Sequence, residues 1–153
     1  MALFLAQHGL SQSKDMDPEQ GLSPAGTLDV EQVAKWAREH GLRVARIIHS
    51  GKKRALQTAE IFAAALKPEG GVVVQEGLKP LDDPAVFAAT IVDTDNLLVV
   101  GHLPFMEKLV AYLVTGSMEP LVLKSINGGI VCLDREPING HWCIKWTIVP
   151  RLV

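Results

Sequence analysis

The sequence predicts an α/β domain in which a mixed, mostly parallel sheet is flanked by helices. As far as Gly116, short apolar runs alternate with amphipathic stretches of helical period, the pattern of repeated strand–helix–strand units. Two strand-like segments then flank a loop with the turn dipeptide Asn139-Gly140, which indicates a hairpin at one side of the sheet. A chain of 153 residues has the size of one domain. We therefore expect residues 1–153 to form a single three-layer sandwich.

The predicted strands are short and, in the first part of the chain, almost continuously apolar. Such runs are typical of strands that are buried on both faces of a parallel sheet. They are predicted at 3–6, 44–49, 72–75 and 97–100, with the two hairpin strands at 129–134 and 141–149.

The predicted helices begin and end at residues suited to those places. Ser23 is a good N-cap and Pro24 suits the first turn, while Gly41 suits the position after the last turn. Ser50 is predicted to cap the second helix, which ends before 68–71. A short helix is predicted near 84–91 and a longer one over 104–115.

The composition is that of a globular protein and excludes several classes of partner. The formal net charge of −2 gives no electrostatic footprint for nucleic acid or for an anionic membrane. No run approaches the roughly 20 apolar residues that span a bilayer, and the apolar run before Gln7 is too short for a signal peptide. Cys132 and Cys143 are expected to be buried free thiols. These observations favour a cytoplasmic enzyme or binding protein.

Three polar residues follow directly after predicted strands. His8, Ser50 and His102 each come at the carboxyl end of an apolar run. In open α/β sheets the crevice beyond those ends binds ligands, so we expect the three side chains to meet there. His49 is predicted to point to the opposite face from Ser50 and is left outside this site. The five histidines lack the close spacing of a ligand set, so neither a metal nor another cofactor is predicted.

Three cations follow Ser50 in the sequence. Lys52, Lys53 and Arg54 fall in the predicted first turn of a helix, where the helix dipole disfavours positive charge. Their presence there is consistent with a bound anion such as phosphate. The alternative is that Lys52 and Lys53 extend into water, where the cost is small, and for these two lysines we favour that alternative.

Three motifs together resemble the histidine phosphatase superfamily, and most closely its short SixA-type phosphohistidine phosphatases. They are Gln7-His8-Gly9, the segment Ser50–Thr58 and the segment Val99–His102. The family has Arg-His-Gly in the first motif and a proline where this chain has Gly51. Further similar stretches are Leu22–Gly26, Leu78-Lys79-Pro80 and Gly101–Pro104. The resemblance covers nearly the whole chain and implies a phosphoglycerate mutase-like fold.

The resemblance also implies a mechanism and a substrate. His8 is implied as the nucleophile that forms a covalent phosphohistidine, Arg54 as the guanidinium that holds the phosphoryl oxygens, and His102 as a donor to them, best as imidazolium. The implied substrate is a phosphohistidine on another protein, and inorganic phosphate or sulfate is expected to occupy the same site. The residues implied to bind phosphate are Gln7, Gly9, Ser50, Arg54, Gly101 and His102.

Gln7 is the main departure from the family, because glutamine has no charge and only one donating end. We therefore expect a phosphohistidine phosphatase with reduced activity. The alternatives are a phosphate- or phosphohistidine-binding module with little turnover and a small-molecule phosphomonoesterase. Glu76, Asp82 and Asp83 follow the third predicted strand and are candidates for a general acid, although Asp82 and Asp83 are more typical of a turn before a proline.

Overall fold

The computed structural model describes residues 2–91 and 95–151, so the ends of the predicted domain 1–153 and its residues 92–94 lie outside the described part. Six strands form one sheet, as expected. Their bounds are β1 Ala2–Gln7, β2 Arg46–His49, β3 Val72–Val74, β4 Leu97–Gly101, β5 Ile130–Arg135 and β6 Trp142–Ile148.

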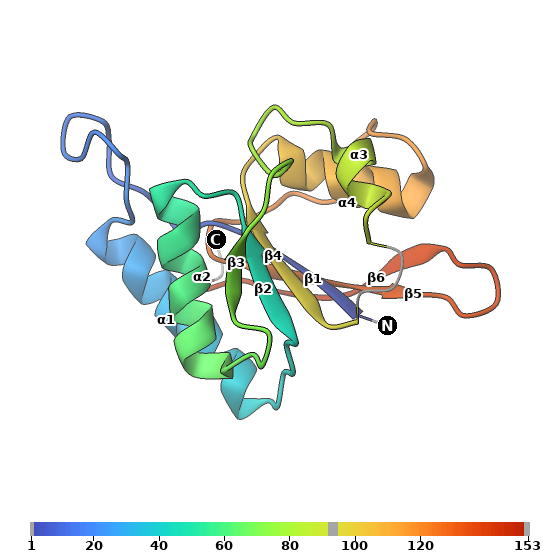
Figure 1. Ribbon diagram of the computed structural model, residues 1–153, viewed down its shortest axis with the longest axis horizontal. Coiled ribbons are helices and arrows are strands. Elements are labelled where there is room, and N and C mark those ends of the chain that lie inside the picture. The colour runs from blue at the N-terminus through green and yellow to red at the C-terminus, as the bar shows by residue number, and fades with distance from the viewer. Residues whose placement is uncertain (1, 92–94, 152–153) are drawn as a thin grey trace.

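The sheet is mixed, with the strand order β3-β2-β4-β1-β5-β6. The first four strands in that order are parallel, while β5 runs antiparallel to both β1 and β6. The hairpin therefore occupies one side of the sheet, as its sequence indicated. Because β1, β2 and β4 are parallel neighbours, their carboxyl ends meet at one edge of the sheet (Figure 1).

Helices cover both faces of this sheet. Helices α1 (Pro24–Glu39) and α2 (Lys53–Leu66) pack on one face, and α3 (Pro84–Ala88) and α4 (Phe105–Thr115) pack on the other (Figure 1). A hydrophobic core lies on each face of the sheet, and alternate residues of β1 belong to one or the other. Leu3 and Leu5 pack on the side of α4, whereas Phe4 and Ala6 pack on the side of α1 and α2. The three-layer α/β fold class is thereby confirmed.

The helix ends follow the expected chemistry with one exception. The Ser23 side chain accepts the amide N–H of Gly26 and caps α1, and Gly116 ends α4 in the left-handed conformation. Ser50, however, does not cap α2, because Lys52 occupies that position and the helix begins at Lys53. The glycine at 51 has a φ of 91° and separates Ser50 from the helix, so Ser50 is free to contact another element.

Two further features complete the fold. Both cysteines are free thiols, as predicted; Cys132 is buried, but Cys143 is exposed on the edge strand β6, contrary to the expectation that both are buried. Among the described residues no helix combines the length and apolar character needed to cross a membrane.

Candidate functional site

His8 is the first residue after β1, and its imidazole is oriented by two hydrogen bonds. The Nδ1–H group donates to the backbone carbonyl of Gly9 at 2.7 Å, which leaves the lone pair of the neutral ring on Nε2. Arg54, in the first turn of α2, donates its Nε–H to that nitrogen at 3.3 Å. A nucleophilic nitrogen and a cation therefore converge on one point.

His102 lies beside His8 and is almost fully buried. It follows β4, is 1% exposed, and its ring centroid is 5.0 Å from that of His8. Its Nε2 shares a 2.5 Å hydrogen bond with Oγ of Ser50, and the same hydroxyl oxygen accepts the amide N–H of Lys52. The residues that follow three parallel strands thus meet as expected, and α2 adds Arg54 to the cluster.

Both imidazoles of the cluster are held in the neutral form. Burial lowers the pKa of His8, and the Arg54 guanidinium lowers it further against the opposing effect of the Gly9 carbonyl. The pKa of His102 falls to about 3, first because of burial, then because protonation would place its charge beside His8, and then because of the cations Arg54 and Lys52. His102 is therefore neutral, in contrast to the imidazolium that the family resemblance implied.

The backbone around His8 is fixed by contacts with β4, with the loop before β5 and with α2. The His8 amide donates to the carbonyl of Gly101 at 3.0 Å, and the side-chain amide of Asn127 donates to the His8 carbonyl at 3.0 Å. The Gly9 amide donates to Oγ1 of Thr58, whose hydroxyl donates in turn to the carbonyl of Arg54. Thr58 therefore connects the two motifs, and Asn127 contributes from a loop in which no sequence motif had indicated a role.

Gly9 and Gly101, the glycines of the two histidine motifs, lie in close contact with side chains of the neighbouring helices. A Cβ on Gly9 would lie 2.7 Å from Cγ2 of Val30, and a Cβ on Gly101 would lie 2.6 Å from Sδ of Met106. Both distances are shorter than real Cβ contacts, so a Cβ at either position would force Val30 of α1 or the flexible Met106 side chain of α4 to shift. Because the Gly9 amide is already bonded to Thr58, the structure gives it no free donor for phosphate.

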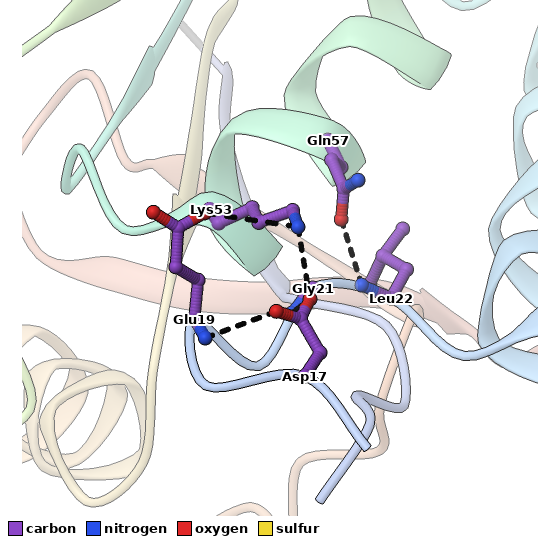
Figure 2. A network of polar contacts seen from close by, with 6 residues as sticks. All are labelled: Asp17, Glu19, Gly21, Leu22, Lys53 and Gln57. Carbon is purple, nitrogen blue, oxygen red and sulfur yellow. Dashed lines mark hydrogen bonds and ion pairs between the residues drawn. The ribbon is translucent and has the colours of Figure 1, made fainter. Parts of the chain in front are cut away.

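Lys53 belongs to a second polar network, which ties the loop before α1 to α2 (Figure 2). Its Nζ lies 2.9 Å from Oδ2 of Asp17 and 3.7 Å from Oε2 of Glu19. Asp17 also accepts the amide N–H groups of Gly21 and Glu19. These hydrogen bonds lower the pKa of Asp17 to about 2, and the bond from Lys53 has the largest effect. Lys53 is therefore paired within the protein rather than solvated or directed at the cluster.

Gln57 anchors the end of the same loop. Its Oε1 accepts the amide N–H of Leu22 at 2.7 Å, one turn of α2 beyond Lys53 (Figure 2). Two side chains of one helix thus hold residues 17–22 against the start of α2. The motif Ser50–Thr58 therefore contains loop anchors as well as site residues, a division of roles that the sequence pattern does not show.

Gln7 lies at the end of β1 but makes no hydrogen bond to His8, Arg54 or His102 within the described residues. Gln7 also lines a cavity of about 200 Å³, with Asn127 and Arg151 among the other lining residues. Oε1 of Gln7 and Nδ1 of His102 are buried, and neither has a hydrogen-bond partner in the part of the chain that the structure describes. Such atoms cost about 1–3 kcal/mol each when nothing satisfies them.

The three candidate acids stay apart from the cluster; Glu76 and Asp83 are exposed and Asp82 is half-buried. Asp82 accepts the amide N–H of Lys79, and Asp83 caps α3 by accepting that of Ala85. Glu76 is exposed in the same loop region. Across residues 2–91 and 95–151, no hydrogen bond or ion pair joins a carboxylate to a side chain of the cluster. Asp82 and Asp83 are turn residues, as their position before Pro84 favoured.

The described residues contain no group of three or more His, Cys, Asp or Glu side chains placed to hold a metal ion. The cluster consists instead of two neutral imidazoles, one guanidinium and one hydroxyl, with Lys52 close by. Guanidinium and hydroxyl groups are suited to phosphate oxygens, and an imidazole with a free lone pair is a nucleophile near neutral pH.

Comparison with protein families and sequences gives matches that agree with this chemistry. Residues 3–82 match the model of the histidine phosphatase superfamily (branch 1). Over 98% of its length the chain is 26% identical to the phosphohistidine phosphatase SixA of Escherichia coli K12, and the match covers 94% of that protein.

Solved structures match the chain over nearly its full length. The protein histidine phosphatase SixA complexed with tungstate has a TM-score of 0.84 at 24% identity, covering 98% of this chain and 97% of the other. The phosphoserine phosphatase of Entamoeba histolytica in complex with 3-phosphoglyceric acid has a TM-score of 0.70 at 16% identity, covering 95% of each chain. At these identities the similarity concerns the fold.

Proposed function

The chain belongs to the histidine phosphatase superfamily (branch 1), and on that premise we propose that it is a phosphohistidine phosphatase acting on another protein. The single observation that carries the proposal is the contact between Arg54 and His8. It places a cation suited to phosphate 3.3 Å from Nε2, the unprotonated nitrogen of the neutral His8 ring. The similarity to SixA over 98% of the chain supports the same reaction.

In the proposed first step, Nε2 of His8 forms a bond to phosphorus as the bond from phosphorus to the substrate imidazole breaks. The electron pair of the broken bond goes to the leaving nitrogen. When the second nitrogen of the substrate ring carries a proton, the ring leaves as neutral imidazole. His8 needs no deprotonation for this attack, because its proton is on Nδ1, bonded to the Gly9 carbonyl, and its Nε2 is already unprotonated. Arg54, which donates to Nε2, moves its bond to the phosphoryl oxygens in this proposed step.

In the proposed second step, water hydrolyses the phosphorylated His8. The water oxygen bonds to phosphorus, the bond from phosphorus to Nε2 breaks, and its electron pair returns to the ring. The proton of the water goes to the departing phosphate. Both steps depend mainly on positioning and on cations around the phosphoryl oxygens, which Arg54 supplies with Lys52 nearby. His102 and Ser50 are proposed as hydrogen-bonding partners of those oxygens.

No carboxylate of the described residues bonds to the cluster, which favours phosphohistidine over a phosphate ester. An alkoxide leaving group needs a proton from a general acid, and Asp82 and Asp83 are committed to backbone amides of their own loop. An imidazole leaves without such an acid. A phosphohistidine phosphatase is therefore favoured over a small-molecule phosphomonoesterase.

We further propose that Gln7 slows the reaction. The described cluster holds one guanidinium, that of Arg54, and Lys53 cannot replace the second because it is paired with Asp17. Loss of one transition-state donor costs about 10²–10³ in rate at comparable sites. The same observation favours the second candidate function, a phosphohistidine-binding module with little turnover, since one guanidinium and two imidazoles still suffice for ground-state binding.

Labelling with a reactive phosphoramidate donor separates the two candidates. A phosphatase acquires acid-labile phosphate on His8 and releases inorganic phosphate over many turnovers, whereas His8→Asn does neither. The surface variant His40→Asn serves as the matched control. Tungstate or phosphate binding without labelling or turnover would instead establish the binding module, and absence of all three would refute both.

A further inference from the structure

His49 is a buried histidine for which the proposed reaction has no use. It ends β2, is 5% exposed, and its backbone is paired with β3 on one side and β4 on the other. Its carbonyl accepts the amide N–H of Gln75 at 2.9 Å. A buried imidazole needs a partner for its ring nitrogens, and the partner that His49 has is informative.

The Nδ1 atom of His49 accepts the amide N–H of Gly51 at 3.0 Å. The bond runs from a side-chain acceptor to the amide two residues later, which is the geometry of an Asx turn with imidazole in place of the asparagine oxygen. It closes a ring around Ser50, the residue between the two. The hydroxyl of Ser50 contacts His102, and α2 with Arg54 begins two residues after Gly51.

Gly51 explains why such a restraint is needed. The family motif carries proline there, which fixes its own φ and has no N–H to donate. Gly51 has a φ of 91°, a conformation open to glycine, and glycine left alone is the most flexible residue in a chain. The imidazole of His49 restrains this turn by accepting the N–H that proline lacks, at a φ that proline, fixed near about −65°, does not adopt.

We propose that His49 is a positioning residue that holds the turn 50–52 so that Ser50 faces His102 and Arg54 faces His8. It touches none of the reacting atoms and acts through the amide of Gly51. This inference rests on the proposed function for its kinetic consequence, but its structural part concerns the hydrogen bond from Gly51 to His49 alone. Burial lowers the pKa of His49, which keeps Nδ1 available as an acceptor near neutral pH.

The test compares two substitutions at one position. His49→Leu fills a similar volume without an acceptor, whereas His49→Asn restores an oxygen acceptor in the same turn geometry. We expect His49→Leu to lower kcat on phosphoramidate by about tenfold to a hundredfold through misplacement of the site, with a smaller change in KM. His49→Asn should recover kcat to within about threefold of the native protein, and the surface control His40→Leu should match the native protein. Native kcat in His49→Leu, or no recovery in His49→Asn, overturns the proposal.

Two readouts keep this inference separate from the proposed function. If the native protein shows no turnover, the proposed function fails, and the His49 variants are then judged by their dissociation constants for tungstate, with the same order expected. If His49→Leu does not fold, nitrogen NMR of the native imidazole decides. We expect the Nε2–H tautomer with an unprotonated Nδ1, and a protonated Nδ1 on His49 overturns the inference whatever the enzyme does.

Discussion

Arg54 donates its Nε–H to Nε2 of His8 across 3.3 Å, so the cation of one motif meets the lone pair of the other. The two residues are far apart in the sequence and close in space because β1 and β2 end at the same edge of the sheet, with β4 between them. A phosphoryl group bound to His8 would lie within reach of the guanidinium.

Substitution of Arg54 tests this contact. Lysine keeps a positive charge but loses the planar pair of donors that matches phosphate, so Arg54→Lys should lower kcat/KM on phosphoramidate by about 10²–10³. The measurement is steady-state release of phosphate, accompanied by tungstate affinity. Arg43→Lys, at an exposed position near the start of β2, is the matched control and should match the native protein. Full activity of Arg54→Lys would remove the guanidinium from the proposed mechanism.

Lys52 and Lys53 are neighbours in sequence that should behave differently. Lys52 acts electrostatically on His102, whereas Lys53 is bonded to Asp17. Lys52→Met should weaken tungstate binding by about twofold to fivefold at low salt, less at high salt. Lys53→Met should leave that affinity near the native value and instead loosen the loop 17–22, which proteolysis would detect. Equal losses of affinity in both variants would contradict the separation.

His102 should make the protein less stable in acid. In the unfolded chain its pKa is near 6.5, and in the folded protein burial lowers it to about 3. Between these values the unfolded chain binds more protons, so the free energy of unfolding falls as the pH is lowered from 6.5 towards 3. His102→Asn should show a smaller fall, measured as urea midpoints at pH 7.5 and pH 4.5. Identical falls in the two proteins would show that His102 is not the group responsible.

Gln7 can be converted to the residue of the family motif. If the missing guanidinium limits the rate, Gln7→Arg should raise kcat/KM on phosphoramidate by up to about 10² and tighten tungstate binding. Gln7→Lys should gain less, because an ammonium lacks the bidentate fork. An unchanged rate in Gln7→Arg would mean that another feature of the site limits turnover.

Gly26 supports the fold rather than the chemistry. A Cβ at this position would lie 2.0 Å from the carbonyl oxygen of Leu10, a backbone atom fixed by its bond to the Ser23 amide. Gly26→Ala should therefore lower the free energy of unfolding by about 1–3 kcal/mol or more, measured by urea denaturation. Ala25→Ser, at the exposed neighbouring position, should change it little. Native stability in Gly26→Ala would mean that α1 can shift away from Leu10 without cost.

Strand and helix positions were readable from the sequence because they depend on local patterns. Continuous apolar runs predicted β1 and β4, and Ser23 with Pro24 predicted the start of α1, since period and capping chemistry act over a few residues. At Ser50 the local pattern predicted the wrong helix start. This serine is a good helix cap by type, yet a positive φ at Gly51 moves the helix start to Lys53 and frees Ser50 for His102.

The sequence by itself determined the α/β architecture and the residues that follow the strand ends, because burial and strand polarity bring such residues to one edge. Only the tertiary structure decided the partners: Lys53 with Asp17, His49 with Gly51, and Thr58 with Gly9. Hydrogen bonds depend on distances of a few tenths of an ångström between groups on different elements. The hydrophobic periodicity of the sequence does not predict such distances.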